Sequence, residues 1–399
     1  MRRINGHRQR YAWGSPTVLP QFLRTVADGE PWAELWFGAH PLAPATVAPS
    51  NLALNEAVSA DPEGMLGDSV ARAFDGALPY LMKLIAPAEP LSLQVHPTRE
   101  HARECFAAEN AAGLPLDSPE RNYRDANHKP EMVLALEPFE ALCGFRTPRK
   151  AASILEGLEA PLAKRMLDLL VAQPSAHGMR AAFRMLVAPA MRPEPSEITV
   201  LANECAARLE SHRSPSPRID RAVALLNEKY PGDPGVAATL LLNPVSLKPG
   251  EAMFVPAGAL HSYLSGFAVE IMASSDNVLR AGITPKKVDA DELLQCVSVT
   301  AAPPIRIAPE RLSDATSAYF APIDDFELST FTSEVRDDSS AQTLVGTGPR
   351  IVLCIEGPLT LETSAGVDTL ERGEAVFIAA AEGPLTVRGH GRLVQASVP

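Results

Sequence analysis

The chain has 399 residues, of which 46% are hydrophobic and 21% charged, and its formal net charge at pH 7 is -12. This length is too great for one ordinary hydrophobic core, so we expect two or three structural units. The negative charge excludes nucleic acid and acidic membrane surfaces as natural partners, because neutralising phosphates requires clustered lysine and arginine.

The chain shows no membrane-spanning or secretory pattern. The N-terminal segment MRRINGHRQRYAWG has no apolar run, and no later stretch approaches the roughly 18 uninterrupted apolar residues that a spanning helix requires. We therefore expect a cytoplasmic protein. The five cysteines are scattered and never spaced as Cys-x-x-Cys, so neither a disulfide framework nor a cysteine-based zinc site is indicated.

Short apolar runs broken by Pro, Gly and Asn predict a β-rich region from the start to about residue 147. One helix is expected within it, capped by Thr98 and ended by Gly113. From about 148 to 231 apolar residues recur at helical spacing, as in AASILEGLEAPLAKRMLDLL, which predicts a helical insert. The frequent prolines favour short strands and turns over long helices.

The β pattern returns at 232 and continues more weakly from 331 to the end. We predict three units: a metal-binding catalytic domain made of 1–147 and 232–330, the helical insert 148–231, and a C-terminal domain 331–399.

A partial internal repeat relates the last two β regions. GEAMFVPAGALHSYLSG, from Gly250, aligns with GEAVFIAAAEGPLTVRG, from Gly373, but the second copy lacks the histidine. Two related β-barrels would explain this, one metal-binding and one without its ligand. The alternative is the chance recurrence of a hydrophobic strand after a Gly-Glu turn.

The first copy carries a histidine at a tight turn. It fits the pattern G-x5-P-x-G-x2-H-x3-S, with the residues Gly250, Pro256, Gly258, His261 and Ser265. This resembles the second motif of the cupin superfamily, which normally ends in Asn, so Ser265 is a departure at a non-ligand position. The turn would point His261 back into a barrel. Alone, a histidine after a turn is more often a surface residue.

Three earlier residues could complete a metal site. Gln94 and His96 are two residues apart in LSLQVHP, so both face one side of a strand, either a barrel interior or solvent. Glu131 leads the apolar strand in NHKPEMVLAL, as a ligand at the barrel mouth or as an exposed strand start. Together with His261 they supply two nitrogens and two oxygens, a set that suits zinc better than iron or manganese.

In several segments the chain resembles the type I phosphomannose isomerases. The matching segments run in the family's order over most of residues 10 to 290: YAWGS, AELWFGAHPLAPA, LPYLMKLIAPAEPLSLQVHP, NHKPEM, PAGALHSY and SDNVLRAGITPKKVD. The family's zinc ligands correspond to the same four residues, Gln94, His96, Glu131 and His261.

The resemblance implies one zinc ion per chain and the interconversion of mannose 6-phosphate and fructose 6-phosphate. The fold class that we expect is mainly β with a helical insert: a metal-binding cupin-type jelly-roll barrel, a degenerate C-terminal barrel and an α-helical subdomain. The expected ligand is a phosphorylated hexose, and the oligomeric state is left open, with a monomer compatible with the sequence.

Such an isomerisation passes through an enediol and needs an electrophile for the carbonyl oxygen and a base for the carbon-bound proton. Arg280 in DNVLRAG lies among apolar neighbours, where a guanidinium needs a phosphate or carboxylate partner. The family's proposed catalytic arginine corresponds to this position. We predict that Arg280 binds phosphate or stabilises the enediolate.

Three further residues are candidates for substrate contact or proton exchange. Lys129 and Asp276 could move protons or bind sugar hydroxyls, and Ser92 shares the inward face with Gln94. The structural alternatives are a turn cap or a salt bridge to Arg280 for Asp276, and a strand-end hydroxyl for Ser92. The basic residues Arg121 and Arg124 are expected to be ordinary surface charges, and Lys286 and Lys287 add positive charge after the His261 strand.

Two other functions use the same metal-binding pattern. One is an iron-dependent cupin dioxygenase, and the other is a non-catalytic sugar-binding cupin. Gln94 in place of a second inward histidine, together with the basic residues, argues against the dioxygenase. The intact ligand set and Arg280 argue against the binding protein.

Overall fold

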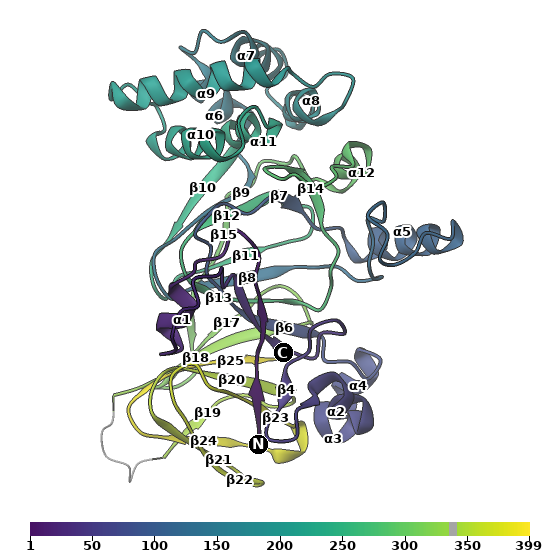
Figure 1. The fold of residues 1–399 in the computed structure, drawn as a ribbon, viewed down its shortest axis with the longest axis vertical. Helices are drawn as coiled ribbons and strands as arrows, with labels where there is room; N and C mark the ends of the chain where they lie inside the picture. The colour runs from purple at the N-terminus through teal and green to yellow at the C-terminus, as the bar shows by residue number, and fades with distance from the viewer. Residues whose placement is uncertain (335–340) are drawn as a thin grey trace.

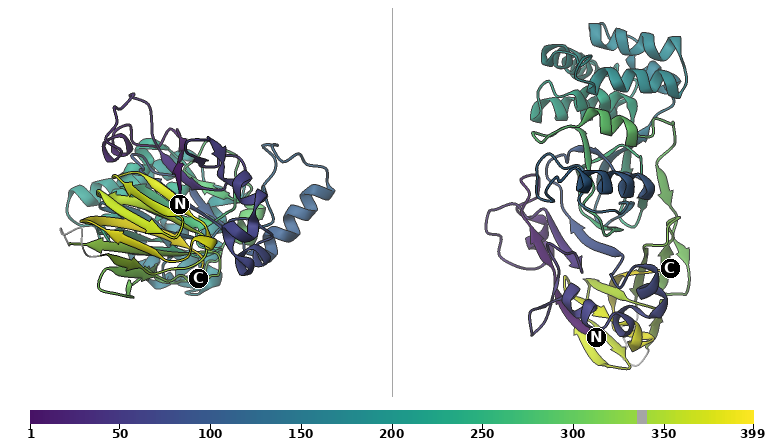
Figure 2. Two further views of the ribbon diagram at one scale, coloured as in Figure 1. Left: turned by 90° about the horizontal axis from the view of Figure 1, so that it is seen from below. Right: turned by 90° about the vertical axis from the view of Figure 1, so that its right-hand side faces the viewer.

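The computed structural model describes residues 1–334 and 341–399. Three units follow one another along its longest axis: a helical unit, a first β-barrel and a second β-barrel, and both chain termini lie beside the second barrel (Figures 1 and 2). This arrangement confirms the expected fold class, which is mainly β with a helical insert.

The first barrel is formed by two antiparallel sheets. The larger has, in spatial order, β15 (Ile305–Ile307), β11 (Ala252–Val255), β8 (Glu131–Ala135), β13 (Ala268–Ala273), β6 (Tyr80–Ile85), β3 (Glu34–Gly38) and β2 (His7–Gln9). The smaller has β10 (Leu242–Leu247), β9 (Phe139–Phe145), β12 (His261–Ser265), β7 (Leu93–Val95) and β14 (Leu279–Gly282). Strands β6, β8 and β13 are buried along their whole length, which explains their nearly continuous apolar sequences.

The second barrel also has two sheets. The larger has β16 (Glu310–Arg311), β17 (Thr316–Tyr319), β18 (Glu327–Ser333), β25 (Gly391–Ser397), β20 (Arg350–Glu356), β23 (Ala375–Ile378), β1 (Arg2–Asn5), β4 (Thr46–Val47) and β5 (Leu52–Ala53). The smaller has β19 (Gln342–Leu344), β24 (Leu385–Arg388), β21 (Leu359–Thr363) and β22 (Gly366–Leu370).

Strand pairing departs from the predicted domain boundaries at two places. Strands β16 and β17 precede residue 330 but pair within the sheet of the second barrel. The first strand of the chain, β1, also joins this sheet beside β23. The sequence pattern does not indicate the place of β1, because β1 and β23 lie at opposite ends of the chain and are joined by backbone hydrogen bonds. The boundary near residue 330 falls inside β18, with which β17 pairs. Positions 335–340 of the predicted C-terminal domain lie outside the described residues.

The two barrels share one hydrophobic interface. The outer face of the seven-stranded sheet supplies Phe254 and Ile271, and the nine-stranded sheet supplies Phe377 and Val394. Three short helices that connect β5 to β6 also contribute to this cluster: α2 (Leu54–Ala60), α3 (Pro62–Leu66) and α4 (Asp68–Ala73). Burying apolar area on this scale makes the barrels one folded body.

The helical unit lies against the outer face of β7 and β9 (Figure 1). Its helices are α6 (Pro148–Leu155), α7 (Pro161–Ala172), α8 (Ala176–Val187), α9 (Pro195–Glu210), α10 (Pro217–Lys229) and α11 (Pro234–Ala238). All but α8 begin at a proline, whose missing N–H is not needed in the first turn. The prolines therefore start helices here, whereas composition alone suggested turns.

Two helices flank the smaller sheet of the first barrel. Helix α5 (Arg99–Ala111) follows β7, and the hydroxyl of Thr98 accepts a hydrogen bond from the backbone of His101, which confirms the predicted cap. Helix α12 (Ala290–Cys296) follows β14. The remaining helix, α1 (Val18–Phe22), lies on the barrel's outer side. Within the described residues no helix is long and apolar enough to cross a membrane.

Candidate active site

One row across the smaller sheet of the first barrel carries three polar residues. Gln94 of β7 pairs with His261 of β12 on one side and with Arg280 of β14 on the other. Residues directly opposite on neighbouring strands point to the same face of a sheet. Strand pairing therefore collects on one surface three side chains that are distant in the sequence.

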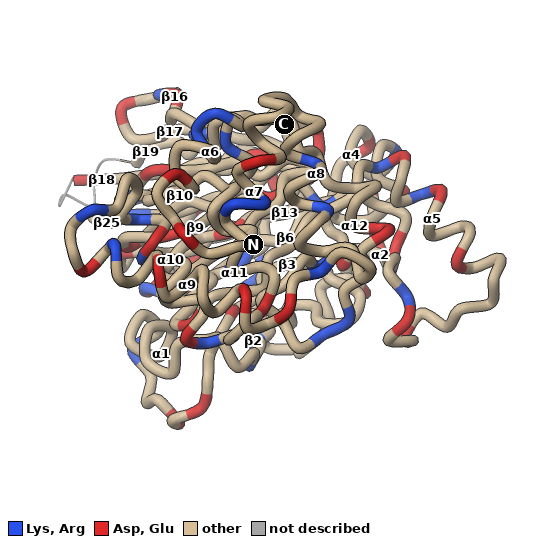
Figure 3. Tube along the Cα trace, turned by 90° about the horizontal axis from the view of Figure 1, so that it is seen from above, with Lys and Arg blue, Asp and Glu red and all other residues tan. Residues whose placement is uncertain are grey.

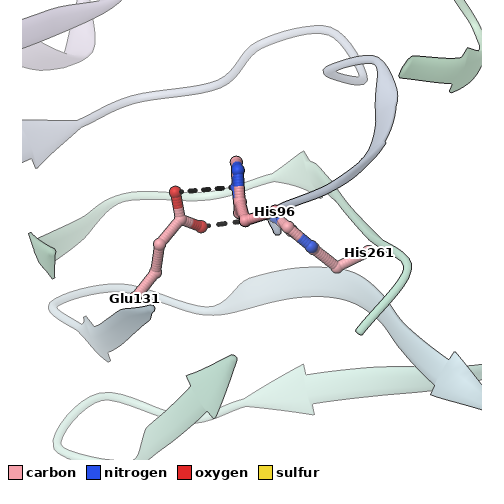
Figure 4. A group of neighbouring side chains, drawn as sticks. All are labelled: His96, Glu131 and His261. Carbon is pink, nitrogen blue, oxygen red and sulfur yellow. Dashed lines mark ion pairs between the residues drawn. The ribbon is translucent and has the colours of Figure 1, made fainter. Parts of the chain in front are cut away.

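The larger sheet completes a compact polar group with Glu131, the first residue of β8. One carboxylate oxygen lies 3.2 Å from Nε2 of His96 and the other lies 3.3 Å from Nε2 of His261. Figure 4 shows the carboxylate facing both rings. All three side chains are buried, and their ligand atoms lie within 4.8 Å of one another.

The tautomers of the two histidines follow from their other ring nitrogens. Nδ1 of His96 donates to the carbonyl of Asn277 at 2.7 Å, and Nδ1 of His261 donates to the carbonyl of Ala259 at 2.9 Å. Each Nε2 therefore presents a lone pair. Burial is the largest influence on His96 and lowers its pKa to about 4, so its ring is neutral near pH 7.

This group fits a bound cation. Two nitrogen lone pairs and a carboxylate face one another, and Nε2 of His96 is buried without a hydrogen-bond partner. Such an arrangement of acceptors is stabilised when a metal ion occupies the space between them. Burial raises the pKa of Glu131, but its interactions with His96, Lys129 and His261 outweigh this and hold the pKa well below its ordinary value.

Gln94 is the fourth residue of the predicted ligand set. Its Nε2 lies 3.3 Å from Nε2 of His261, so the amide faces the same group. The nitrogen and oxygen of an amide exchange places on a half-turn, and the oxygen is the atom that a cation would select. The four residues therefore offer the two nitrogens and two oxygens that the sequence indicated.

A cavity of about 460 Å³ opens beside this group. The predicted site residues that line it are Ser92, Gln94, Lys129, Glu131, Asp276 and Arg280. Its volume lies in the range of small-molecule sites. The structure thus brings together every site residue named from the sequence, because His96 and His261 adjoin the cavity through Glu131.

The guanidinium of Arg280 makes no hydrogen bond or ion pair with any described residue, although the side chain is about half buried. Burial lowers its pKa, and the positive charge of Arg124 lowers it further. Lys286 lines the same cavity, and burial followed by the charge of Arg280 lowers its pKa. These cations destabilise each other in the absence of an anion.

Asp276 does not form the salt bridge to Arg280 that was one expectation. Its carboxylate lies 3.2 Å from Nε2 of His40, and its backbone N–H donates to Asp125 at 2.8 Å. Burial raises the pKa of Asp276, but the hydrogen bond from His40 and nearby positive charges outweigh this and lower the pKa. Asp276 is therefore ionised at neutral pH and can accept a proton.

Sequence reasoning missed a buried charge cluster on the inner face of the larger sheet. Nζ of Lys83 lies 3.2 Å from Glu270 and 3.7 Å from Glu34, and all three line the cavity. Burial lowers the pKa of Lys83, but the surrounding carboxylates outweigh this and raise it. The signal was present: Lys83 and Glu270 are each the only charge within an apolar strand.

Asn277 was missed as well. Besides accepting from His96, this buried residue donates through its amide to the carbonyls of Asp125 and Asn127, both at 2.8 Å. It therefore ties the loop before Glu131 to the segment before Arg280. The group that accepts a hydrogen bond from a metal-facing histidine typically tunes the metal's affinity, and here it is the backbone carbonyl of Asn277.

Arg121 and Arg124 differ from the surface charges that were expected. Arg121 is buried and donates to the carbonyls of Tyr123 and Leu114 and to Asn110, so its role is to hold a loop. Arg124 lines a second hollow of about 430 Å³ that shares Arg280 and Lys286 with the first. Elsewhere positive and negative residues are interspersed along the chain (Figure 3), so this basic region is local.

Comparison with known proteins assigns the family. The model of the type I phosphomannose isomerase catalytic domain matches residues 1–148, and that of the mannose-6-phosphate isomerase cupin domain matches residues 318–398. The mannose-6-phosphate isomerase of Escherichia coli is 38% identical, with 99% of both chains covered. This chain belongs to the type I phosphomannose isomerases.

The similarity extends to distant organisms and to solved structures. The human mannose-6-phosphate isomerase is 31% identical over 94% of this chain and 92% of its own. A zinc-bound mannose 6-phosphate isomerase superposes with a TM-score of 0.88 at 36% identity, covering 100% of this chain and 99% of that one. A variant of the Salmonella typhimurium phosphomannose isomerase gives a TM-score of 0.89 at the same identity and coverage.

Membership of the type I phosphomannose isomerases confirms the isomerase that the sequence predicted, and the dioxygenase and sugar-binding alternatives are not favoured. Zinc is likewise supported, by the histidine–glutamate–histidine group and by the zinc-bound relative.

Proposed function

We propose that this chain interconverts mannose 6-phosphate and fructose 6-phosphate in the cavity of the first barrel, with one zinc ion held by Gln94, His96, Glu131 and His261. The observation that carries the proposal is the meeting of the metal-binding group and the unpaired cations in one cavity. The metal-binding group suits the carbonyl oxygen of a sugar, and the cations Arg280 and Lys286 suit its phosphate.

When bound, zinc supplies a Lewis acid that polarises the sugar carbonyl, an effect worth several kcal/mol. The protein's contribution is to fix the donor atoms. The backbone carbonyls of Asn277 and Ala259 hold the two imidazoles in the tautomer with Nε2 free. Burial of Glu131 keeps water from competing for its carboxylate.

Arg280 and Lys286 bind the anionic end of the substrate in this proposal. Both line the cavity, and a dianionic phosphate would relieve their mutual repulsion. Arg280 is also in register with Gln94, so it lies beside the metal-binding row. This position lets the same guanidinium stabilise negative charge on the enediolate.

Ionisable residues that line the cavity carry out the proton transfer in this proposal. We assign Asp276 as the group that takes the proton from carbon 2 and returns it to carbon 1, since its pKa is lowered and it is ionised at neutral pH. Lys129, whose ammonium lies 3.4 Å from Glu131, binds a sugar hydroxyl and helps to move the oxygen-bound proton. Ser92 contacts the sugar from the strand end.

The direct test is an isomerase assay on the purified chain with mannose 6-phosphate and its aldose analogues. We expect turnover that a chelator abolishes and zinc restores. Full zinc occupancy without turnover of any of these sugars would contradict the proposal.

Point variants test the assigned roles. Arg280→Ala should raise KM and lower kcat together, because it loses both the phosphate contact and charge stabilisation. Lys129→Met should lower kcat while zinc content is kept. Lys287→Met is the matched control, since that ammonium pairs with Glu120 2.8 Å away and does not line the main cavity. Normal kinetics for Arg280→Ala would remove it from the mechanism.

A cytoplasmic location and a monomeric state stay predictions. Fractionation of the source cells tests the first, and light scattering of the purified chain over a range of concentrations tests the second.

A further inference from the structure

A second cluster of potential metal ligands lies between α5 and α12, outside the isomerase cavity. Helix α5 contributes His101 and Cys105, and helix α12 contributes Glu292 and Cys296. Each pair is four residues apart, the spacing that places two side chains on one face of a helix. The two helices therefore present matching pairs to each other.

The ligand atoms of His101, Glu292 and Cys296 form one tight group, and Sγ of Cys105 lies beside it, next to His101 and Glu292. Sγ of Cys105 lies 3.6 Å from Nε2 of His101 and 3.8 Å from Oε1 of Glu292, and Sγ of Cys296 lies 3.7 Å from the same Oε1. The ligand atoms of His101, Glu292 and Cys296 all fall within 4.8 Å of one another. Residues almost 200 positions apart in the chain thus converge on one point.

Three sulfur separations in the cluster, from the two thiols to His101 and Glu292, match edges of a zinc tetrahedron. Zinc–sulfur bonds of about 2.3 Å and zinc–nitrogen or zinc–oxygen bonds of about 2.1 Å give sulfur-to-nitrogen or sulfur-to-oxygen edges of about 3.6 Å. The three observed sulfur distances agree with this value to within a few tenths of an ångström. The edge between His101 and Glu292 is shorter, 2.6 Å, because the two share a hydrogen bond.

We propose that His101, Cys105, Glu292 and Cys296 form a second metal site, which takes zinc or another thiophilic divalent cation in a closed, four-protein-ligand shell. Two thiolates with one imidazole and one carboxylate are a donor set that favours such ions over magnesium or calcium. The site lies beyond the proposed isomerase chemistry, because none of the four residues lines the cavity.

Proton balance sets a condition for binding. Burial raises the pKa of Cys296 to about 12 and also raises that of Cys105, and the carboxylate of Glu292 adds to both effects. Both thiols are therefore protonated near neutral pH without a metal. Binding of one divalent cation releases these two protons, so affinity rises with pH.

The position of the cluster suggests a supporting role. Just after α12, the backbone N–H of Ser298 donates to the carbonyl of Gly258 at 2.9 Å, and the N–H of Gly258 donates to the carbonyl of His96 at 2.8 Å. A metal joining α5 to α12 would therefore stabilise the turn between the two metal-facing histidines of the first barrel. We expect a higher Tm when this site is filled.

A competing explanation is a purely hydrogen-bonded cluster. The hydroxyl of Tyr123 donates to Glu292 and contacts Cys296 at 3.3 Å, so the network has partners without a metal. The sequence also offered no Cys-x-x-Cys spacing. The two explanations differ in whether sulfur becomes bonded to a metal, and this is measurable.

The test uses the full chain, purified with a non-thiol reductant, stripped by a chelator and reloaded with Co²⁺. Thiolate-to-cobalt charge transfer in the near ultraviolet reports sulfur ligation, and the isomerase site has no cysteine among its proposed ligands. We expect this absorption in the wild type, with two metal ions per chain by elemental analysis.

Matched variants assign the signal. The double variant Cys105→Ser/Cys296→Ser should lose the charge-transfer absorption and one metal ion while keeping isomerase activity. His261→Ala should keep the absorption and lose the other ion. Glu104→Gln/Asp291→Asn, at exposed positions of the same helices, should behave like the wild type.

Wild-type protein that binds cobalt without charge-transfer absorption would overturn the proposal, and so would a cysteine variant with unchanged metal content. If the cysteine variant does not fold, the wild-type and His261→Ala spectra decide the matter by themselves. Failure of the second site would leave the isomerase proposal intact, since that proposal depends on His261 and turnover.

Discussion

Each barrel contains one copy of the sequence repeat, and the two copies share their first turn and strand but differ after the strand. Gly250 and Gly373 both adopt positive φ, at 86° and 89°, and each opens a strand, β11 or β23. In both copies the glutamate after the glycine accepts a hydrogen bond of 2.9 Å from a backbone N–H three residues earlier. The repeat noticed in the sequence is therefore a repeated turn with a physical basis.

The difference starts after the strand. In the first barrel the chain turns through Pro256 and Gly258 and returns with His261 on β12. In the second it forms the short helix η2 (Ala380–Glu382), and Pro384 stands where alignment places the histidine. The second interior is filled by apolar side chains such as Val376. The barrel fold thus does not require the metal group, which is a local addition to it.

The largest effect is expected from a substitution that follows the turn of the first barrel, compared with the aligned substitution in the second barrel. His261→Ala should lower kcat/KM by at least about 10³-fold and abolish zinc binding in the first barrel, because Lewis-acid assistance is worth several kcal/mol. Pro384→Ala, at the aligned exposed position of the second barrel, should leave both unchanged. Steady-state kinetics with elemental analysis make the comparison. An equal loss in both variants would break the distinction between the barrels.

The second prediction concerns what the barrels share. Phe254 and Phe377 occupy aligned positions of the repeat, are 2% and 0% exposed, and pack in the same cluster between the sheets. Each substitution by alanine should cost about 3–5 kcal/mol of unfolding free energy through lost burial and a cavity. Denaturant unfolding measures this, and turnover per folded molecule should persist. A negligible cost at either position would show that the interface is not shared.

A smaller effect tests the support of the metal group. Asn277→Ala should weaken zinc affinity by about 10–100-fold, because it removes the side-chain hydrogen bonds to the loop before Glu131 and so loosens the segment whose backbone carbonyl holds the imidazole of His96. Asn243→Ala is the control, since that amide also binds backbone carbonyls of this barrel, at Gly144 and Phe145, but contacts no ligand. Competition with a chromophoric chelator gives both affinities, and equal values would refute this role.

The smallest effect is a pH dependence. The folded-state pKa of Asp276 is below its ordinary value of 3.8, so its ionised form stabilises the fold above that pH, and the contribution disappears as the pH falls through the lower folded value. Wild-type Tm should therefore fall more steeply below about pH 4 than that of Asp276→Asn. Scanning calorimetry of both proteins tests this, and parallel curves would mean that Asp276 is not held by His40.

Sequence reasoning reached the metal group because its chemistry is local. Strand alternation links Gln94 to His96, and a turn motif marks His261, so the residue types and spacings carry the information. Lys83 and Glu270 were missed because their meaning depends on pairing across β6 and β13, which spacing does not encode.

The fold shows the same limit. The helical insert and the two β regions are visible in composition and periodicity, and the cap of α5 is a short-range pattern. Strand β1 joins the second barrel by pairing with β23 at the other end of the chain, and no local sequence pattern predicts this pairing. Cys105 and Cys296 likewise approach the same carboxylate oxygen of Glu292 only because the fold brings α5 beside α12.

Anomalous diffraction at the zinc edge tests the central claim most directly. In crystals of the zinc-loaded chain we predict a peak within bonding distance of Gln94, His96, Glu131 and His261, and none inside the second barrel. Absence of density at that group in a zinc-dependent active enzyme, or a peak in the second barrel instead, would contradict the account.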